Sequence, residues 1–384
     1  MIRAKLLVQK YFPTFEATKF CDKMTPTKHN WTKEEIIAIY NKPLMDLMYE
    51  AATIHREHHD PNVVQVSTLL SIKTGGCPED CGYCPQAARY HTNIEGNDLM
   101  SVSQVKAQAL RAKSSGSSRV CMGAAWRNVK DGPEFDQVLE MVRTINKLDM
   151  EVCCTLGMLT ENQAQRLAEA GLYAYNHNLD TSEEYYKEVI STRGFEDRLQ
   201  TIDNVRKTNV TVCSGGIIGM GESIEDRAGM LVALSTLNPQ PESVPINALV
   251  AVEGTPMENE KPVEIWEMIR MVATTRIVMP ETQVRLSAGR TEMSREGQAM
   301  CFFAGANSIF AGDKLLTTPN PDVNEDMKMF ETLGLQPQKP FIKLMQPKTV
   351  EAEDSQFQSL GEKPKWSRPD HKIERNLEAS TKGK

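Results

Sequence analysis

Short apolar runs rich in β-branched residues alternate along the chain with longer segments whose apolar residues recur every three or four positions. Runs of the first kind predict buried strands, and the longer period predicts helices that bury one face. Because the two kinds alternate from about residue 32, the pattern predicts a parallel sheet with helical crossovers. Eight strands are expected, at 66–74, 119–123, 151–156, 172–180, 210–218, 243–250, 283–288 and 308–311.

Helices are expected between these strands, and several have a capping residue at the start, namely Ser101, Thr160 and Ser223. Eight strand–helix units predict an α/β fold, a closed (βα)8 barrel of the TIM type. A doubly wound open sheet would also alternate, but residues 215–222, GGIIGMGE, do not fit its phosphate fingerprint. The expected helices cover 101–113, 135–148, 161–170, 224–237 and 263–278.

Length and composition divide the chain into three expected parts. The barrel takes residues 32–340, preceded by a helical N-terminal extension at 1–31. Residues 341–384 are polar and charged, with few aromatic or β-branched residues to bury, so we expect a disordered tail.

Charge and hydropathy exclude two classes of partner. The net charge is −7 and the basic residues are scattered, so no basic stripe exists for nucleic acid. No apolar run approaches the roughly 18 residues of a membrane span, which predicts a water-soluble protein. The first residues are basic but lack a signal-peptide core, so we expect a cytoplasmic protein, with a mitochondrial transit peptide as the alternative.

Three cysteines, Cys77, Cys81 and Cys84, follow the first predicted strand in the loop KTGGCPEDCGYCPQ. The loop falls at the C-terminal mouth of a barrel, where such folds place their chemistry. A cubane iron–sulfur cluster normally takes four thiolates, so three leave one iron open for a ligand. Nine cysteines at irregular spacing in a long chain also indicate free or metal-bound thiols in a reducing compartment.

Two other interpretations of the triplet stay open. A structural zinc site wants four ligands, and His91 is a weak candidate for the fourth. A thioredoxin-like redox pair at Cys81 and Cys84 would leave Cys77 unused.

Three more cysteines, Cys121, Cys153 and Cys213, lie within predicted strands. A buried cysteine is most often just a small apolar residue. Inward positions on different strands of a barrel converge, however, so the three together could hold a second metal centre. Because side chains alternate along a strand, Cys153 and its neighbour Cys154 must face opposite sides.

Polar residues on the later strands point to a ligand site. Asn176, Asn178 and Asp180 alternate along the fourth predicted strand and so share a face, where a ligand could satisfy them. The alternative is that their side chains only form hydrogen bonds at the end of the strand. Arg285 shares a face with Ser287 in the same way, and Asn247 offers both donors and acceptors.

At these residues the chain closely resembles the biotin synthase family of the radical S-adenosylmethionine superfamily, from about residue 31 to 337. The motifs are VSTLLSIKTGGCPEDCGYCPQ, CMGAAW, YNHNLDT, VCSGGIIGMGE, ESVPIN and VRLSAGR.

The resemblance implies a four-iron (4Fe-4S) cluster held by Cys77, Cys81 and Cys84, with S-adenosylmethionine chelating the open iron. Tyr83 would lie beside the adenine. Residues matching the superfamily element GxIxGxxE would lie near the adenosyl group: Gly215, Ile217, Gly219 and Glu222.

The resemblance also implies a two-iron (2Fe-2S) cluster, the sulfur donor, on Cys121, Cys153, Cys213 and Arg285. The residues alone would have made Arg285 a charge partner, because a guanidinium offers no lone pair. Asn178 and Asp180 would contact ribose and substrate, and Asn247 the ureido ring of dethiobiotin. Residues expected to line this cluster are Arg119, Ser67 and Ser287.

The activity that the resemblance implies is radical insertion of sulfur into dethiobiotin to form biotin, in a homodimer reduced by flavodoxin or ferredoxin. Two alternatives stay open: another radical enzyme on the same barrel, and a non-catalytic zinc- or dithiol-binding protein.

Overall fold

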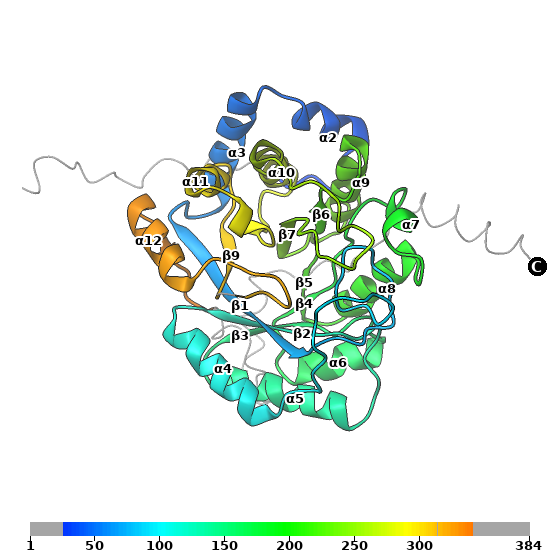
Figure 1. Cartoon of the computed structure of the whole chain (residues 1–384). Coiled ribbons are helices and arrows are strands. Elements are labelled where there is room, and N and C mark those ends of the chain that lie inside the picture. Colours follow the sequence, from blue (N-terminus) through cyan, green and yellow to red (C-terminus); the bar gives the residue numbers. More distant parts are fainter. Residues whose placement is uncertain (1–25, 313, 341–384) are drawn as a thin grey trace, which may run out of the picture.

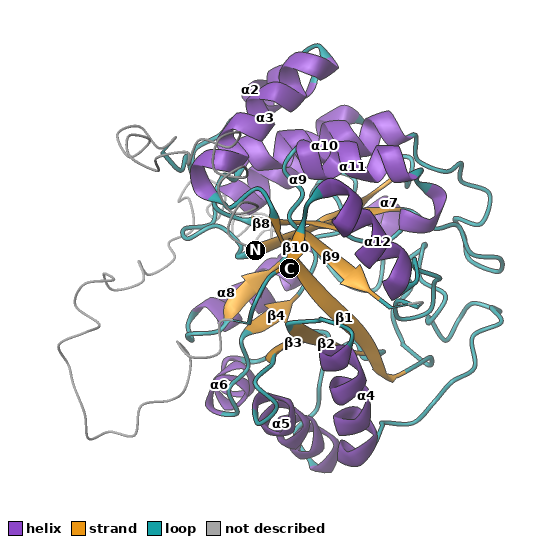
Figure 2. Cartoon of the chain, turned by 90° about the vertical axis from the view of Figure 1, so that its left-hand side faces the viewer, coloured by secondary structure: helices purple, strands orange, loops and turns teal. Residues whose placement is uncertain are grey.

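The computed structural model describes residues 26–312 and 314–340, and its centre is a closed barrel of parallel strands (Figures 1 and 2). The sheet order is β1-β2-β3-β4-β5-β7-β8-β9, and β1 pairs with β9 to close the ring. The predicted barrel is therefore confirmed. Its strands are β1 (Val63–Lys73), β2 (Arg119–Ala124), β3 (Glu151–Thr155), β4 (Ala174–Asn176), β5 (Thr211–Cys213), β6 (Gly216–Ile218), β7 (Ser243–Ala248), β8 (Gln283–Leu286) and β9 (Ser308–Ala311).

The predicted fifth strand, 210–218, is divided into β5 and β6, and both pieces pair with β7. The break falls at Ser214 and Gly215. A Cβ atom at Gly215 would lie 2.1 Å from the carbonyl oxygen of Pro245, so only glycine allows this close approach. The fourth strand also ends earlier than predicted, at Asn176, because the chain bends and Asp180 adopts a left-handed φ of 68°.

Helices surround the barrel, and the predicted capping residues begin three of them (Figure 1). Ser101, Thr160 and Ser223 each accept a hydrogen bond from the backbone N–H three residues on, in reciprocal capping boxes. The helices after the first strand are α4 (Val102–Ser114), α5 (Pro133–Asn146), α6 (Glu161–Glu169), α7 (Tyr186–Val189), α8 (Phe195–Arg206), α9 (Ile224–Ser235), α10 (Ile265–Val278), α11 (Arg295–Phe303) and α12 (Val323–Leu333), with a 3-10 turn at Arg290–Glu292.

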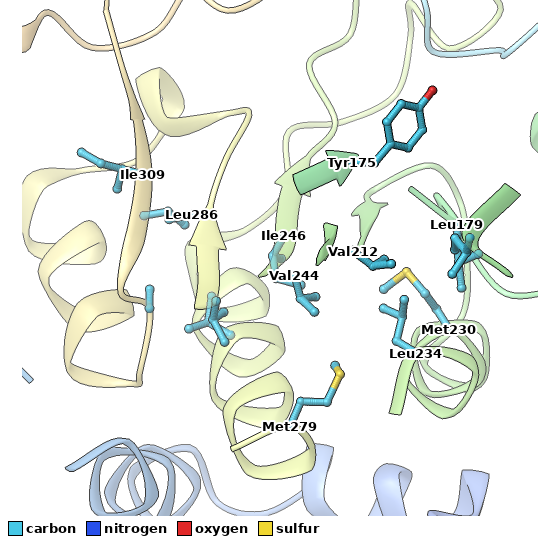
Figure 3. Packing of buried hydrophobic residues seen from close by; sticks show 14 of the residues in the cluster. Tyr175, Leu179, Val212, Met230, Leu234, Val244, Ile246, Met279, Leu286 and Ile309 are labelled. Atoms are coloured by element: carbon cyan, nitrogen blue, oxygen red, sulfur yellow. The ribbon is translucent and has the colours of Figure 1, made fainter. Parts of the chain in front are cut away.

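The main hydrophobic core lies between the outer face of the barrel and these helices. Figure 3 shows strand residues such as Val244 and Ile246 beside Met230 and Leu234 of α9, and all four are buried. A second, smaller cluster lies inside the barrel and includes three cysteines. The barrel thus has an aliphatic outer face and a chemically different interior.

Two helices precede the barrel, α2 (Lys33–Tyr40) and α3 (Leu44–His58), and both pack against α10. Residues 26–31 form no helix, and residues 1–25 of the predicted helical extension lie outside the described part. The predicted tail at 341–384 also lies outside it, and the last described strand, β10 (Gln336–Pro337), pairs with the start of β1. Over the described ranges, none of the helices combines the length and apolarity needed to cross a membrane.

Candidate active site

A cavity of about 320 Å³ opens at the C-terminal mouth of the barrel, and both groups of cysteines line it. The loop after β1 contributes Cys77, Cys81 and Cys84, and the strands contribute Cys121 and Cys153. The loop cysteines and two of the strand cysteines therefore border one shared space.

The triplet of cysteines lies in a tight loop entered through Gly75 and Gly76, which have φ values of 75° and 71°. The Cys84 N–H donates to the Cys81 carbonyl at 2.9 Å, and the Ala88 N–H donates to the Cys77 carbonyl at 2.7 Å. All three thiols are free. Burial raises the pKa of Cys81 to about 11 and that of Cys84 to about 12, so the thiolates need a cation or a metal to form at neutral pH.

The strand cysteines form a second group inside the barrel. Cys121 and Cys153 lie opposite each other on β2 and β3, and both pack with Cys213 in one buried cluster. Cys154 faces the other way and packs in the outer core. The alternation of side chains along a strand predicted that Cys153 and Cys154 face opposite sides, and the structure confirms this.

Arg285 lies beside this second group without an acidic partner among the described residues. Its Nη1 is 3.7 Å from the Cys213 sulfur, while Nη2 and Nε donate to Gln65 at 2.8 Å and to Ser308 at 2.9 Å. Its guanidinium also covers the ring of Phe310 at 4.7 Å. A buried cation with only neutral partners favours an anionic group at the cysteines.

Arg119 is also fully buried, but its charge is compensated. Its Nε donates to Glu151 at 2.8 Å, and its two terminal nitrogens donate to Glu242 at 3.2 and 2.9 Å. The guanidinium lies over the ring of Tyr173 at 4.7 Å. Arg119 therefore contributes a closed ionic network, whereas Arg285 leaves a positive charge directed at the cysteines.

Unbonded polar atoms mark the interior as a place for a further group. Within the described residues, the buried Nε2 of Gln65 and the hydroxyls of Ser67 and Ser243 have no hydrogen-bond partner. Such atoms are costly in a packed interior unless something bonds them. Ser287, which the sequence placed here, lines the cavity, whereas Gln65, Ser67 and Ser243 are not among its lining residues.

The end of β4 forms a polar wall of the cavity. The Asn176 amide donates to the Cys213 sulfur at 3.3 Å and to Asn178 at 3.1 Å. Asp180 accepts hydrogen bonds from Tyr83, at 3.0 Å, and from Arg198. The three predicted residues line one cavity, but they reach it through a bend after Asn176 and not through strand parity, so His177 lines it as well.

Several residues that line the cavity were not predicted from the sequence, and two of them are arginines. Arg198 is buried on α8 and also donates to the Asn178 carbonyl at 2.7 Å. Arg198 lies on the same buried face of α8 as Phe195, Ile202 and Val205. This helical spacing could have predicted from the sequence that Arg198 is buried. Arg193, Glu79 and His177 also line the cavity.

The GxIxGxxE element contributes mainly to the shape of the site. Glu222 accepts from the N–H groups of Gly219, at 2.9 Å, and Met220, at 2.7 Å, so its carboxylate fixes its own loop. Ile217 lines the cavity, whereas Glu222 does not. Gly215 allows the close approach to Pro245 described above.

Asn247 lines the cavity with much of its amide already bonded. Its Nδ2 donates to the Gly216 carbonyl at 2.9 Å, and its Oδ1 accepts from the Ala288 N–H at 3.1 Å. One N–H and one oxygen lone pair remain for a ligand.

The cysteine groups differ from a site for a single ion. Among residues 26–312 and 314–340, no three His, Cys, Asp or Glu side chains come together closely enough to hold one metal ion. A cluster spreads its ligands over several irons, so its ligands lie farther apart than those of a zinc ion.

Comparison with known families agrees with this chemistry. Residues 71–234 match the Radical SAM superfamily, and residues 245–336 match the Biotin and Thiamin Synthesis associated domain. The first match includes the cysteine triplet and the second includes Arg285.

Several curated relatives are similar over most of their length. The chain is 93% identical to the biotin synthase of Flavobacterium johnsoniae, over 93% of this chain and 99% of the relative. It is 64% identical to the biotin synthase of Cytophaga hutchinsonii, over 83% of this chain and 94% of the relative. It is 58% identical to that of Nostoc punctiforme, over 81% of this chain and 94% of the relative.

Solved structures share the fold at low sequence identity. Methylornithine synthase superposes with a TM-score of 0.67 at 18% identity, covering 80% of this chain and 94% of that one. The hydrogenase maturase HydG of Carboxydothermus hydrogenoformans superposes with a TM-score of 0.68 at 16% sequence identity. The match covers 80% of this chain and 76% of that one. These structures share the fold, while the curated relatives and the two family matches show that the chain belongs to the biotin synthase family within the radical S-adenosylmethionine superfamily.

Proposed function

We propose that this chain is the enzyme that inserts sulfur into dethiobiotin to form biotin. The observation that carries the proposal is the single cavity lined by both cysteine groups. Radical chemistry at the mouth of the barrel and sulfur donation from its interior need to meet at one small molecule, and a shared cavity allows this.

The loop cysteines Cys77, Cys81 and Cys84 would hold the four-iron cluster that the superfamily uses with S-adenosylmethionine. Their free thiols, at the entrance of the cavity, fit a group that takes three thiolates. Tyr83 is between two of these cysteines and bonds Asp180, so it ties the loop to the polar wall.

Cys121, Cys153, Cys213 and Arg285 would hold the two-iron cluster. The three thiols belong to one buried cluster inside the barrel, and the Arg285 guanidinium has one nitrogen 3.7 Å from the Cys213 sulfur. The unbonded Gln65, Ser67 and Ser243 atoms supply polar contacts for such a group.

When bound, the two clusters and S-adenosylmethionine supply a carbon radical and a sulfur atom. The protein orients the reactants: Asn178, Asp180 and Arg198 form a fixed polar wall for ribose and substrate, and Asn247 offers its remaining N–H to the ureido ring. Gly215, Ile217, Gly219 and Glu222 shape the wall beside the adenosyl group. The barrel excludes water and other quenchers from the reacting atoms.

The partners follow from the same proposal. Dethiobiotin is the small-molecule substrate, flavodoxin or ferredoxin the electron donor, and a second copy of the chain completes a homodimer. The relatives named above come from bacteria, so we place the enzyme in the cytoplasm and not in a mitochondrion. We also propose that the chain is organised as an N-terminal extension at residues 1–31, the barrel at residues 32–340 and a C-terminal tail at residues 341–384.

The experiment is anaerobic. Purified protein is analysed for iron and sulfide and then incubated with dethiobiotin, S-adenosylmethionine and a reductant, and biotin is measured. Biotin formation that depends on all three additions supports the proposal. Clusters with no turnover of dethiobiotin would favour another radical enzyme on this barrel, and colourless protein with zinc would favour a non-catalytic protein.

A further inference from the structure

The loop that carries Cys77, Cys81 and Cys84 is anchored by a segment 111 residues farther along the chain. The carboxylate of Asp80 accepts hydrogen bonds from the backbone N–H of Ser191 at 3.0 Å and of Thr192 at 3.1 Å. It also accepts from the Ser191 hydroxyl, and the Thr192 hydroxyl lies within hydrogen-bond distance of both Asp80, at 2.9 Å, and Glu79. We call Asp80, Ser191 and Thr192 the clasp.

The main chain is tied to this segment on both sides of Cys81. The Asp80 N–H donates to the Thr192 hydroxyl oxygen at 3.3 Å, and the Gly82 N–H donates to the Val189 carbonyl at 2.9 Å. Cys81 therefore lies between two anchored residues, which leaves its backbone little freedom.

The anchoring segment also leads into the helix that supports the polar wall. Residues 189–193 are followed by α8, from which Arg198 bonds Asp180 and the Asn178 carbonyl. One stretch of chain thus holds both the cysteine loop and the wall opposite it. Asp80 does not line the cavity, so it can act on the site only through the loop.

We propose that Asp80 is a positioning residue, which fixes the cysteine loop before any cluster binds. The proposal rests on the assignment of a four-iron cluster to Cys77, Cys81 and Cys84. An ordered loop loses less conformational entropy when its thiols are bound, so the clasp should slow the loss of the cluster. A carboxylate suits this role because it is acceptor-only and can take four hydrogen bonds at once.

Asp80→Asn tests the clasp, because it keeps the size of the side chain but replaces one accepting oxygen by a donor. We expect the four-iron cluster to be lost to an iron chelator about tenfold faster, as for outer-shell residues of other metal sites. The spectrum of the two-iron cluster should not change. Asp131→Asn is the matched control, since Asp131 is an exposed carboxylate paired with Arg166 at 3.0 Å, outside the cavity.

Hydrogen exchange of the full-length apoprotein gives a readout that needs no cluster. The N–H groups of Gly82, Ser191 and Thr192 should be protected in the unsubstituted protein and should exchange faster together in Asp80→Asn, while the barrel strands keep their protection.

Unchanged cluster retention in Asp80→Asn, or faster exchange throughout the barrel, would overturn the proposal. If the unsubstituted protein takes up no four-iron cluster, the proposed function fails, and the exchange of the three amides alone decides whether the clasp orders the loop.

Discussion

Cys121 and Cys153 lie in register on adjacent parallel strands, β2 and β3, and their side chains belong to one buried cluster. Both are buried in the interior of the barrel with Cys213, whereas Cys154 packs outside with the aliphatic core. Two neighbouring cysteines of one strand thus belong to different parts of the molecule.

This pair gives a matched test of the second cluster. Cys153→Ala should remove the two-iron cluster and abolish biotin formation, because a ligand is lost. Cys154→Ala should keep both, at a cost of roughly 1 kcal/mol in stability for a small buried side chain. Iron and sulfide content and visible spectra of the two variants check the prediction, and loss of the two-iron spectrum in Cys154→Ala would contradict it.

The two cysteine groups should have separable roles. Cys77→Ala should abolish cleavage of S-adenosylmethionine, whereas Cys121→Ala should keep at least part of it and lose ring closure. The measurement is 5′-deoxyadenosine and biotin released under reducing anaerobic conditions. Equal loss of both products in Cys121→Ala, with the four-iron cluster retained, would argue against separate roles.

Asp180 should be needed for its charge and for its backbone conformation. Asp180→Asn tolerates the left-handed φ of 68° but leaves Arg198 without its carboxylate, which should destabilise the protein by about 3 kcal/mol and weaken S-adenosylmethionine binding. Equilibrium binding and urea unfolding measure the two effects. Asp203→Asn is the control, because Asp203 lies on α8 with Arg198 but forms a more exposed ion pair, with Lys207 at 3.9 Å. Equal effects of the two substitutions would refute the prediction.

The ionic network around Arg119 should matter for stability. In E151Q/E242Q a fully buried cation loses both carboxylates, and we expect a loss of about 3–5 kcal/mol. Glu140→Gln breaks an exposed pair with Arg143 and should change stability by less than about 1 kcal/mol. Urea unfolding of reduced apoprotein compares the variants, and a double variant as stable as the control would disprove the role.

Two histidines between α3 and α10 should make stability depend on pH. Burial lowers the pKa of His55 to about 2 and that of His59 to about 3, and the Arg276 charge contributes to both. The folded protein keeps both histidines neutral, while the unfolded chain protonates them near pH 6.5. Their contribution to the free energy of unfolding is therefore complete above pH 6.5 and is lost as the pH falls toward 3. The slope is up to roughly 1.4 kcal/mol per pH unit for His55.

Urea midpoints between pH 7.5 and 5 measure this dependence. H55N/H59Q should flatten the curve over that range relative to the unsubstituted protein. A slope that is the same in both proteins would show that other groups cause it.

Much of the fold followed from local patterns. The eight strand positions and the caps Ser101, Thr160 and Ser223 were predictable because apolar runs and capping residues act within a few positions. The break between β5 and β6 was not, since it depends on the approach of Gly215 to Pro245, a residue 30 positions away.

The site was predictable where side chains follow strand parity and less so where loops carry it. Cys121, Cys153 and Cys213 converge because they lie on parallel strands. Arg193 reaches the cavity from a loop, and its Nη2 lies 4.0 Å from the Cys81 sulfur. No period in the sequence marks such a contact, because it is set by the tertiary path of residues 189–193.

The most direct test of the central claim uses one anaerobic sample with both clusters. Dethiobiotin and S-adenosylmethionine are added with a reductant, and biotin is quantified together with the visible spectrum of the two-iron cluster. We expect biotin to appear as that spectrum declines, with no more than about one biotin per cluster lost if the cluster is the sulfur donor. Biotin formation with the two-iron spectrum intact, or loss of that spectrum without biotin, would contradict it.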